Sequence, residues 1–292
     1  MQYLILVDGN SLMFRAYYAT AYSQQTPTLN SQGKNVNALM VFINMFEKIL
    51  EKTHHHICVA FDSPDKTQRH GIYGDYKKGR PITPQDLIDQ IDLIKEYLTL
   101  SGVKHHAQPT YEADDIIATL AKQASDKNIA TIIYSSDKDF LQLIDENITV
   151  ILIKQGLKKV VYYDIPKLWE EYQLKPAQIV DFKSLVGDSS DNIKGVPSVG
   201  LKTAIKLLNQ FGNLENIYLN LEQLAPKLKD NLKNFQEKVF LNRFLITVNT
   251  LVPLTFDLKE TELTTSKNAL LIAFLQKHEL KKIMLQKIKK EF

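Results

Sequence analysis

Three short apolar runs of this chain each lead into an acidic residue. The acids are Asp8, Asp62 and Asp137, and the runs before them cover residues 3–7, 57–61 and 130–134. Runs of this length are consistent with buried strands, and open α/β sheets bind ligands beyond the carboxyl ends of their strands. We therefore expect the three carboxylates to meet at one sheet edge. Taken singly, each acid is more often a turn or capping residue.

Further acids follow in three short segments, and these are Glu112, Asp114, Asp115, Asp139, Asp188 and Asp191. The first three stand at the start of an expected helix, where acids also favour the helix dipole. If all these carboxylates converge with few cationic partners beside them, they repel strongly. A hard divalent cation such as Mg²⁺ relieves that repulsion. More acids than one ion needs indicate two ions, the arrangement used for in-line phosphodiester displacement.

The elements that must position these acids alternate in type along the first half of the chain. Strand-like runs, with a fourth at residues 148–153, alternate with helical stripes at residues 36–50 and 84–100. We expect Thr83 to cap the second helix and Gly102 to close it. The alternation predicts a parallel α/β sheet flanked by helices. After about residue 165 helical stripes dominate, and the lysine-rich tail has the spacing of an amphipathic closing helix.

Composition limits the class of protein. The chain has 292 residues, 44% of them hydrophobic, and a formal net charge of +3, which indicates one large and one smaller globular domain without overall basic character. Its single cysteine, Cys58, excludes an internal disulfide and fits a reducing compartment. The apolar start is too short for a signal peptide and no run reaches transmembrane length, so we expect a cytoplasmic protein. The run His54-His55-His56 is expected to be an exposed turn.

One segment is rich in cations and tyrosines, and its residues are Lys66, Arg69, Tyr73, Tyr76, Lys77, Lys78 and Arg80. A charge run is usually a solvated loop. Cations can also meet phosphates, and tyrosine rings can stack on unpaired bases. The residues alone leave both interpretations open.

A second segment, Gly195 to Gly200 followed by Leu201-Lys202-Thr203, has the spacing of a tight hairpin before a helix. Glycines let the backbone approach a phosphate closely, and the helix start offers free N–H groups. A nucleotide-binding P-loop needs lysine directly after its second glycine and a strand before the loop. Here Leu201 intervenes and the flanks look helical. We therefore expect a helix–hairpin–helix that grips the DNA backbone without reading sequence, with an ordinary helix connection as the alternative.

Six segments in this order resemble the 5′-nuclease (flap endonuclease) family, most closely the 5′-3′ exonuclease domain of bacterial DNA polymerase I and its stand-alone relatives. They are residues 6–19, 61–69, 76–81, 112–115 (Glu-Ala-Asp-Asp), 136–143 (Ser-Asp-Lys-Asp-Phe-Leu-Gln-Leu) and 187–204 (beginning Gly-Asp-Ser-Ser-Asp-Asn-Ile). The resemblance covers nearly the whole chain. It implies a resolvase-like (PIN-like) catalytic domain with a helical arch over residues 1–170. A helical DNA-binding region with an H3TH-type helix–hairpin–helix would follow over residues 171–292.

The resemblance also implies a ligand set for two Mg²⁺ ions, with Mn²⁺ as a substitute. One ion would be held by Asp8, Asp62, Glu112 and Asp114. The second would be held by Asp114 again with Asp137, Asp139 and Asp188. Asp115 and Asp191 would sit close by, and the hairpin would hold K⁺. Catalysis would rest on Asp8 and Asp114 together with Lys77 and Arg80, which would contact the scissile phosphate.

The resemblance further implies contacts to DNA from Arg15, Lys66, Arg69, Tyr76, Lys77, Arg80, Gly195, Gly200, Lys202 and Thr203. The implied activity is hydrolysis of DNA near 5′ ends, at flaps, nicks and duplex ends, in primer (Okazaki-fragment) processing and repair, with RNA primers as further substrates. We expect a monomer that binds no membrane. A non-cutting, structure-specific DNA-binding protein is the alternative, and missing carboxylates would favour it.

The chain departs from the family pattern at a few positions, and none of them is an expected metal ligand. Lys194 stands where proline is common and Ser198 where glycine is common. Gln68 replaces an aromatic residue, and Ser135-Ser136 replaces a Thr-Gly pair. A small-phosphate hydrolase with an Asp-x-Asp start is disfavoured, because Asn10 occupies the second acid's place. A nicotinamide enzyme is disfavoured, because no Gly-x-Gly-x-x-Gly follows the first strand.

Overall fold

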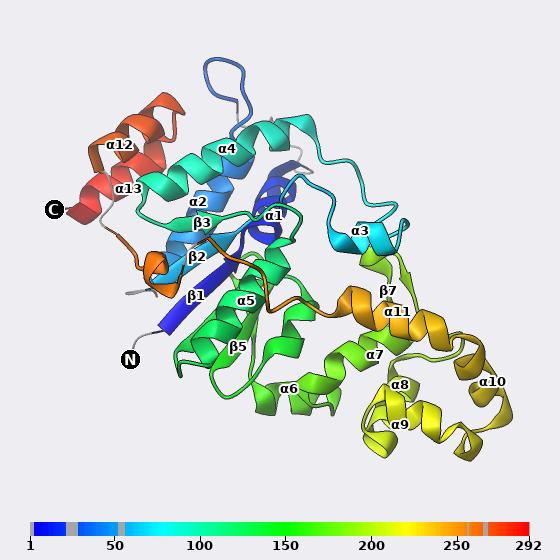
Figure 1. Cartoon of the computed structure of the whole chain (residues 1–292). Helices are drawn as coiled ribbons and strands as arrows, with labels where there is room; N and C mark the ends of the chain where they lie inside the picture. The colour runs from blue at the N-terminus through cyan, green and yellow to red at the C-terminus, as the bar shows by residue number, and fades with distance from the viewer. Residues whose placement is uncertain (1–2, 22–28, 52–55, 256, 265–267, 292) are drawn as a thin grey trace.

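The structure is a computed structural model that describes residues 3–21, 29–51, 56–255, 257–264 and 268–291. Its centre is a six-stranded sheet in the order β3-β2-β1-β4-β5-β6 (Figure 1). All neighbouring strands are parallel except β6, which is antiparallel to β5. The strands are β1 (Tyr3–Asp8), β2 (His56–Ala60), β3 (Lys104–His106), β4 (Ala130–Ser135), β5 (Ile148–Gln155) and β6 (Lys159–Tyr163).

The prediction of a parallel α/β sheet is confirmed, and the four predicted strands are β1, β2, β4 and β5. The prediction did not include β3 and β6. Strand β3 is three residues of Lys-His-His and carries no apolar run. Strand β6 is the sheet edge, where Val160 and Tyr162 are 40% and 49% exposed. Its apolar residues therefore do not form the buried run by which the other strands are recognised.

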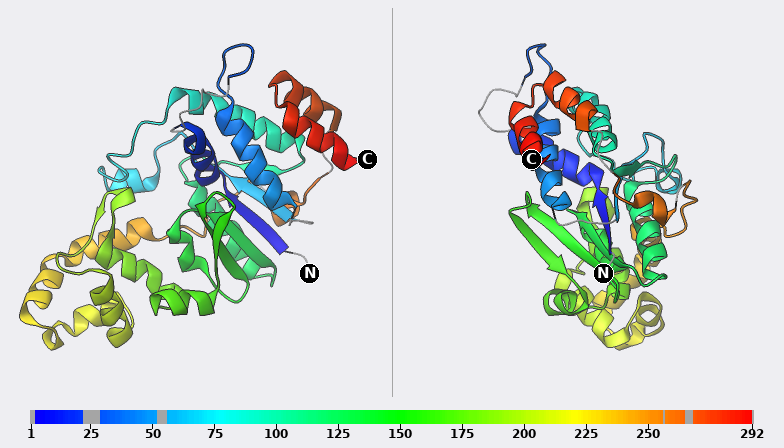
Figure 2. Two further views of the ribbon diagram at one scale, coloured as in Figure 1. Left: turned by 180° about the vertical axis from the view of Figure 1, so that it is seen from behind. Right: turned by 90° about the vertical axis from the view of Figure 1, so that its left-hand side faces the viewer.

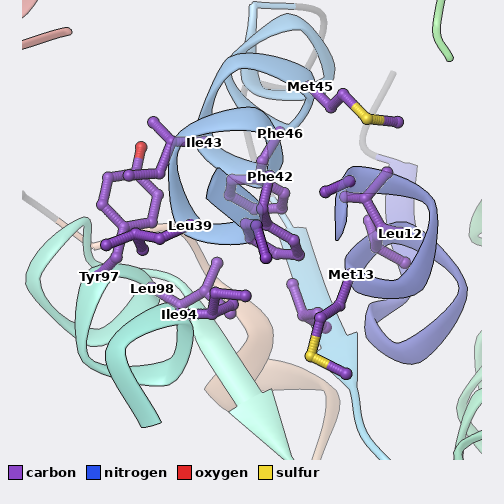
Figure 3. Packing of buried hydrophobic residues seen from close by; sticks show 14 of the residues in the cluster. Leu12, Met13, Leu39, Phe42, Ile43, Met45, Phe46, Ile94, Tyr97 and Leu98 are labelled. Carbon is purple, nitrogen blue, oxygen red and sulfur yellow. The ribbon is translucent and has the colours of Figure 1, made fainter. Parts of the chain in front are cut away.

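The residues of β1 alternate between two layers of helices. Ile5 and Val7 face α1 (Gly9–Ala21), α2 (Asn37–Leu50) and α4 (Gln85–Leu100) in one core. Figure 3 shows its packing, with Phe42 and Phe46 of α2 beside Leu39 and between Met13 and Leu98. Leu4 and Leu6 face α5 (Ala113–Ser125) and α6 (Ile165–Tyr172) in a second core on the opposite face. Because side chains alternate along a strand, one apolar strand serves both layers.

Two local predictions need correction, one about the start of α4 and one about the histidine run. Helix α4 begins at Gln85 with Pro84 as its N-cap residue, so the predicted cap at Thr83 is one residue early. Gly102 has φ +74, as expected of a glycine that closes a helix. Of the histidine run, His54 and His55 lie outside the described residues. His56 is the first residue of β2 rather than part of a turn, and its Nδ1 lies 3.2 Å from Thr261 Oγ1.

The second half of the chain builds a separate helical core at one end of the molecule (Figures 1 and 2). Buried leucines and valines along five helices form it. The helices are α7 (Ile179–Val186), α8 (Leu201–Phe211), α9 (Leu214–Leu219), α10 (Pro226–Asn234) and α11 (Gln236–Ile246). Between α7 and α8 lie two antiparallel two-residue strands, β7 (Gly187–Asp188) and β8 (Ile193–Lys194), joined by the 3₁₀ turn η3 (Ser189–Asp191).

The end of the chain returns to the first domain. Helices α12 (Asn268–Lys277) and α13 (Lys281–Glu291) lie at the end of the molecule opposite the helical core (Figures 1 and 2). Leu275 and Ile283 of these helices are buried in the core of α1, α2 and α4. The region predicted as residues 171–292 is therefore split, because α12 and α13 pack on the first domain. The amphipathic tail helix is confirmed, since α13 buries Ile283 and exposes most of its lysines.

Two short elements lie between the larger ones, one in the segment between β2 and α4 and one in the turn after β4. The first is helix α3 (Gln68–Ile72), and the second is the 3₁₀ helix η1 (Lys138–Leu143). Other 3₁₀ turns are η2 (Pro176–Gln178), η4 (Leu221–Gln223) and η5 (Leu258–Thr261). None of the helices in the described ranges is long and apolar enough to span a bilayer.

Candidate active site

The carboxyl ends of β1, β2 and β4 bring three acids to one edge, as predicted. Asp8 closes β1, where its carboxylate accepts the Ser11 N–H at 2.8 Å and the Ser135 hydroxyl at 2.6 Å. Asp62 follows β2 and accepts the Ala113 N–H at 2.8 Å, at the start of α5. Gly9 follows Asp8 and has no room for a side chain, because a Cβ there would lie 2.6 Å from the Phe61 ring. The backbone after β1 therefore packs closely against the end of β2.

Three of the acids form an inner group that no cation neutralises within 4.0 Å in the described parts of the chain. Asp8, Asp114 and Asp137 are its members. Burial, together with the charges of Asp62 and Asp137, raises the pKa of Asp8 to about 7. Burial and the charges of Asp8 and Asp137 raise the pKa of Asp114 well above its usual range. Burial likewise raises the pKa of Asp137, and although the charge of Lys183 acts in the opposite direction, the charges of Asp191 and Asp188 add to the increase.

Glu112, by contrast, is surrounded by donors from the basic segment. Its Oε1 lies 3.0 Å from Lys77 Nζ and 3.5 Å from Thr67 Oγ1. Its Oε2 accepts the Tyr76 hydroxyl at 3.2 Å and Arg69 Nη1 at 3.4 Å. Burial would lower the pKa of Lys77, but the charges of Glu112 and Asp114 outweigh it and raise the pKa. The expectation of few cationic partners beside the acids is therefore wrong on this side.

Lys183 neutralises acids on the other side of the site, as Lys77 and Arg69 do around Glu112. Its Nζ makes an ion pair with Asp139 and lies 2.6 Å from Asp188 Oδ2. Although burial acts in the opposite direction, this ammonium and the Ser190 hydrogen bonds lower the pKa of Asp188 to about 2. Sequence analysis missed Lys183, which lies in the last turn of α7 outside the acidic segment it serves. Its one available signal was a lysine one helical turn before that segment, separated from it by Ser184, Leu185 and Val186.

Lys77 and Arg80 are held beside the acids by the helical half of the molecule. The Lys77 N–H donates to the Asp191 carbonyl at 3.0 Å, and Lys77 has a left-handed φ of +56. Arg80 pairs with the Asp191 carboxylate and donates to the Ser190 carbonyl at 3.2 Å. Asn192 Nδ2 donates to the Asp75 carbonyl at 2.8 Å. The basic segment is therefore docked on η3 rather than free in solvent.

Several predicted contact residues have defined places in the structure. Lys66 is exposed, as a phosphate contact would need to be. Arg15 donates to Ser136 Oγ at 2.7 Å and to the Lys154 carbonyl at 2.9 Å. Tyr76 is 5% exposed and hydrogen bonded to Glu112, so its ring is not available to stack on a base here. Arg69 is 8% exposed, and its guanidinium donates to Asp115 and to the Leu245 and Thr247 carbonyls, so these donors are not directed at a phosphate here.

The hairpin of residues 195–200 precedes α8 as predicted, but its upstream flank is strand β8, not a helix. That part of the argument against a P-loop was therefore wrong, and the argument from Leu201 remains. Gly195 packs against the end of α7, where a Cβ would lie 2.1 Å from the Val186 carbonyl oxygen. A Cβ on Gly200 would meet nothing within 4 Å. Ser198 has φ +65, which explains a family preference for glycine there.

The start of α8 carries the remaining predicted contacts. Gly200 is its N-cap residue, Lys202 is exposed and Thr203 is half-buried. The first N–H groups of this helix are open to an anion. A cavity of about 690 Å³ lies between this helix and the acids. Its lining residues include Asp137, Tyr172, Phe182, Lys183, Asp188 and Ile205.

All the acids offer carboxylate oxygens, the ligand atoms that hard divalent cations prefer. The carboxylates of the inner group also repel one another, and a bound cation would relieve that repulsion. The donor set therefore fits a divalent metal. Within the described residues, no three acidic, histidine or cysteine side chains are yet gathered closely enough to hold one ion. The lysine ammonium groups lie among the outer carboxylates instead.

Comparison with known families identifies the class of protein that this fold and site define. Residues 3–173 match the 5′-3′ exonuclease N-terminal resolvase-like domain, and residues 174–269 match the 5′-3′ exonuclease C-terminal SAM fold. The chain belongs to the 5′-3′ exonuclease family and is therefore a nuclease of that family.

Its curated relatives are of two lengths. The chain is 42% identical to DNA polymerase I of Lactococcus lactis subsp. cremoris over 88% of its own length and 30% of the relative's. It is 41% identical to DNA polymerase I of Bacillus subtilis over 86% of its length and 28% of the relative's. It thus spans less than a third of those proteins. It is 34% identical to the 5′-3′ exonuclease of Mycoplasma pneumoniae, over 96% of this chain and 97% of that protein.

Solved structures share the fold at low identity. A bacteriophage T5 flap endonuclease in a pseudo-enzyme–product complex with DNA and metal ions has a TM-score of 0.68 at 20% identity, covering 99% of this chain and 98% of that one. T5 5′-exonuclease with divalent zinc ions has a TM-score of 0.67 at 21% identity, covering 84% and 89%. The catalytic core of Rad2 with a DNA substrate has a TM-score of 0.61 at 18% identity, covering 95% and 88%.

Proposed function

We propose that this chain hydrolyses DNA phosphodiesters at 5′ flaps, nicks and 5′ duplex ends by a mechanism that uses two Mg²⁺ ions, with Mn²⁺ as a substitute. The observation that carries the proposal is the inner group of carboxylates, in which Asp8 is buried and Asp114 and Asp137 are half-buried. Besides burial, Asp137 raises the pKa of Asp8, and both of them raise the pKa of Asp114. None of the three makes an ion pair within 4.0 Å among the described residues, although the charges of Lys77 and Lys183 lower the pKa values of Asp114 and Asp137 in part. A site that gathers uncompensated acids is suited to a bound cation and poorly suited to a purely structural role.

The residues that would hold the ions fall on the two sides of this group. Asp8, Asp62, Glu112 and Asp114 would hold one, and Asp114, Asp137, Asp139 and Asp188 the other. The bound ions supply an activated water and stabilise the charge that develops on the phosphate. Lys183 would leave its place between Asp139 and Asp188, and Lys77 would turn from Glu112. Asp115 and Asp191 are omitted from the proposed ligands, because they are paired with Arg69 and Arg80.

The protein's own cations would orient the DNA. Lys77 and Arg80 stand beside the acids and can donate to the scissile phosphate. Lys66, Arg15, Lys202 and the N–H groups at the start of α8 would contact flanking phosphates, which position the duplex without reading its sequence. A K⁺ ion at the hairpin of residues 195–200 belongs to the same proposal. The Pro197 carbonyl already accepts the Asn231 amide at 2.9 Å, so K⁺ would use other hairpin carbonyls.

The biological setting follows from the relatives and from the chemistry. We propose a role in primer (Okazaki-fragment) processing and DNA repair in the cytoplasm, as a monomer, with RNA primers among the substrates. The stand-alone relative from Mycoplasma pneumoniae, which the chain matches end to end, supports activity without an attached polymerase.

The test is cleavage of a 5′-flap duplex labelled at either end, in Mg²⁺ and in EDTA. We expect metal-dependent release of short fragments from the 5′ side. Nicked and blunt duplexes in the same assay give the balance between flap and exonuclease cutting. Tight binding of flap, nick and overhang substrates with no cleavage of any of them would refute the proposal in favour of a non-cutting DNA-binding protein.

A further inference from the structure

We propose that Arg69 and Asp115 form a fixed joint that positions the catalytic residues, and that neither contacts DNA or metal. This inference rests on the proposed nuclease function. Arg69 lies in α3, in the basic segment that carries Lys77, and Asp115 lies in the first turn of α5, next to Asp114. Both side chains are buried, with 9% and 4% of their surfaces exposed. They are positioning residues for the reaction.

The guanidinium of Arg69 has no donor left for a phosphate. Its Nη1 and Nη2 donate to the two carboxylate oxygens of Asp115, each at 2.8 Å, in a bidentate pair. Nη1 also donates to Glu112 Oε2 at 3.4 Å. Nε donates to the Leu245 carbonyl and Nη2 to the Thr247 carbonyl, both at 2.9 Å. An arginine has five N–H donors, and these five bonds use all of them.

The carboxylate of Asp115 is equally occupied. Its Oδ1 accepts Arg69 Nη2 and the Asn249 N–H, each at 2.8 Å. Its Oδ2 accepts Arg69 Nη1 at 2.8 Å and the Glu112 N–H at 3.4 Å. An ionised carboxylate offers about four lone-pair sites, and four donors point at them. A metal ion could bind this carboxylate only by displacing one of these donors, and three of the four bonds, all but the local one from the Glu112 N–H, join separate parts of the molecule.

The joint connects three segments that are far apart in the sequence. Arg69 brings the basic segment, Asp115 brings the start of α5 with Glu112 and Asp114, and residues 245–249 bring the end of α11. Those residues link the helical core, which holds the hairpin, to the first domain. This buried ion pair therefore adds to the contacts of the basic segment with Asp191 and Asn192, and it joins that segment directly to the start of α5 and to the end of α11. Errors of about 1 Å in the positions of catalytic groups are enough to cost about a hundredfold in rate.

The experiment uses the full chain and four variants: Arg69→Gln, Asp115→Asn, the double variant, and Lys66→Ala as the matched control for an exposed cation of the same segment. DNA affinity is measured in EDTA over a salt series, and single-turnover cleavage of a 5′ flap is measured in Mg²⁺. We expect each joint variant to lower the cleavage rate by about ten- to a hundredfold. We expect the double variant to be no slower than the slower single, because the two residues act as a unit.

The salt series separates positioning from DNA contact. Arg69→Gln is expected to leave the dependence of affinity on salt unchanged, whereas Lys66→Ala reduces its slope by about one. A reduced slope for Arg69→Gln, or effects of the two joint variants that multiply, would overturn the joint. If Arg69→Gln does not fold, hydrogen exchange of Asp115→Asn decides. Faster exchange in residues 67–80 and 245–249 supports the joint, and unchanged exchange there contradicts it.

Failure of the proposed function can be distinguished from failure of the joint. If the wild-type chain binds flaps and does not cut them, the cleavage rates of the variants can no longer be compared. The salt slope of Arg69→Gln and the exchange of Asp115→Asn would still decide whether the joint exists.

Discussion

Eight of the nine acids of this site fall into two groups, one with ion-pair partners and one without. The ninth, Asp62, is exposed and makes no ion pair within 4.0 Å among the described residues. The inner group is Asp8, which is buried, with Asp114 and Asp137, which are half-buried, and none of the three makes an ion pair within 4.0 Å among the described residues. Desolvation and neighbouring carboxylates raise the pKa values of all three, although Lys77 and Lys183 partly offset this at Asp114 and Asp137. The outer acids are Glu112, Asp115, Asp139, Asp188 and Asp191, and each is paired with a lysine or an arginine. The ends of β1 and β4 and the first turn of α5 bring the inner acids together, whereas lysines and arginines outside the sheet pair with the outer ones.

Whether a carboxylate has an ion-pair partner separates two roles, metal binding and support of the fold, that the sequence alone does not distinguish among these acids. Carboxylates without partners cost stability and are retained where a ligand repays that cost. Carboxylates with buried partners tie segments together, and removing one member leaves the other charge buried and unpaired. Inner substitutions should therefore mainly affect chemistry, whereas outer substitutions should affect geometry or stability. The following variants test that division, from the largest expected effect to the smallest.

Removal of an inner carboxylate should have the largest effect. Asp137→Ala and Asp114→Ala are each expected to lower single-turnover flap cleavage by about a thousandfold or more, because the charge that would hold a metal ion is gone. DNA binding in EDTA should remain measurable. Glu260→Ala is the control, since Glu260 is an exposed acid paired with Lys104 outside the site. Cutting at near-normal rates by either inner variant in Mg²⁺ would remove the two-ion assignment.

The pH dependence of stability should follow the inner group. The pKa of Asp8 rises from its ordinary 3.8 to about 7 on folding. The folded state therefore holds a proton that the unfolded chain has lost, and stability falls as pH rises across that window. In EDTA, urea unfolding should give a lower free energy at pH 8 than at pH 5. Asp8→Asn should flatten that slope, and an unchanged slope would show that Asp8 does not carry the repulsion.

Lys77 tests the outer group at the point nearest to chemistry. Lys77→Ala is expected to slow turnover by about a hundredfold while changing DNA affinity little, because it would act on the scissile phosphate. The neighbouring Lys78→Ala is the matched control, since Lys78 is exposed and pairs with Asp75. An affinity loss for Lys77→Ala that lower salt cures would instead make Lys77 a positioning contact to phosphate.

Lys183 tests whether the outer pairs are there for stability. Lys183→Met leaves Asp139 and Asp188 facing each other, so the metal-free protein should lose about 1–2 kcal/mol of unfolding free energy. Mg²⁺ should restore part of it and bind more tightly, because a competing cation is gone. Lys206→Met, at an exposed position of α8, is the control. Unchanged stability and unchanged Mg²⁺ affinity, measured by denaturation and calorimetry, would mean that Lys183 neutralises nothing of consequence.

Much of the fold and of the inner group could be predicted because their signals are local. Apolar runs of strand length ending in Asp8, Asp62 and Asp137 imply where those acids meet once the strands are parallel. Strand β3 escaped prediction because it is short and polar, and β6 because an edge strand buries few of its residues. The return of α12 and α13 to the first domain escaped as well, because an amphipathic helix specifies a buried face and not the surface it packs against.

The sequence by itself determined the family, the parallel sheet and the identity of the carboxylates, because each depends on residues that are neighbours in the chain. Only the tertiary structure decided which carboxylates are neutralised and by what. Arg69 donates to a carbonyl 176 residues away, and Lys183 reaches an acid 44 residues away. Such pairs depend on where separate elements meet and on which donors burial leaves available. An arginine or lysine of the sequence can therefore be suited to contact DNA at one position and to stabilise the fold through a buried ion pair at another.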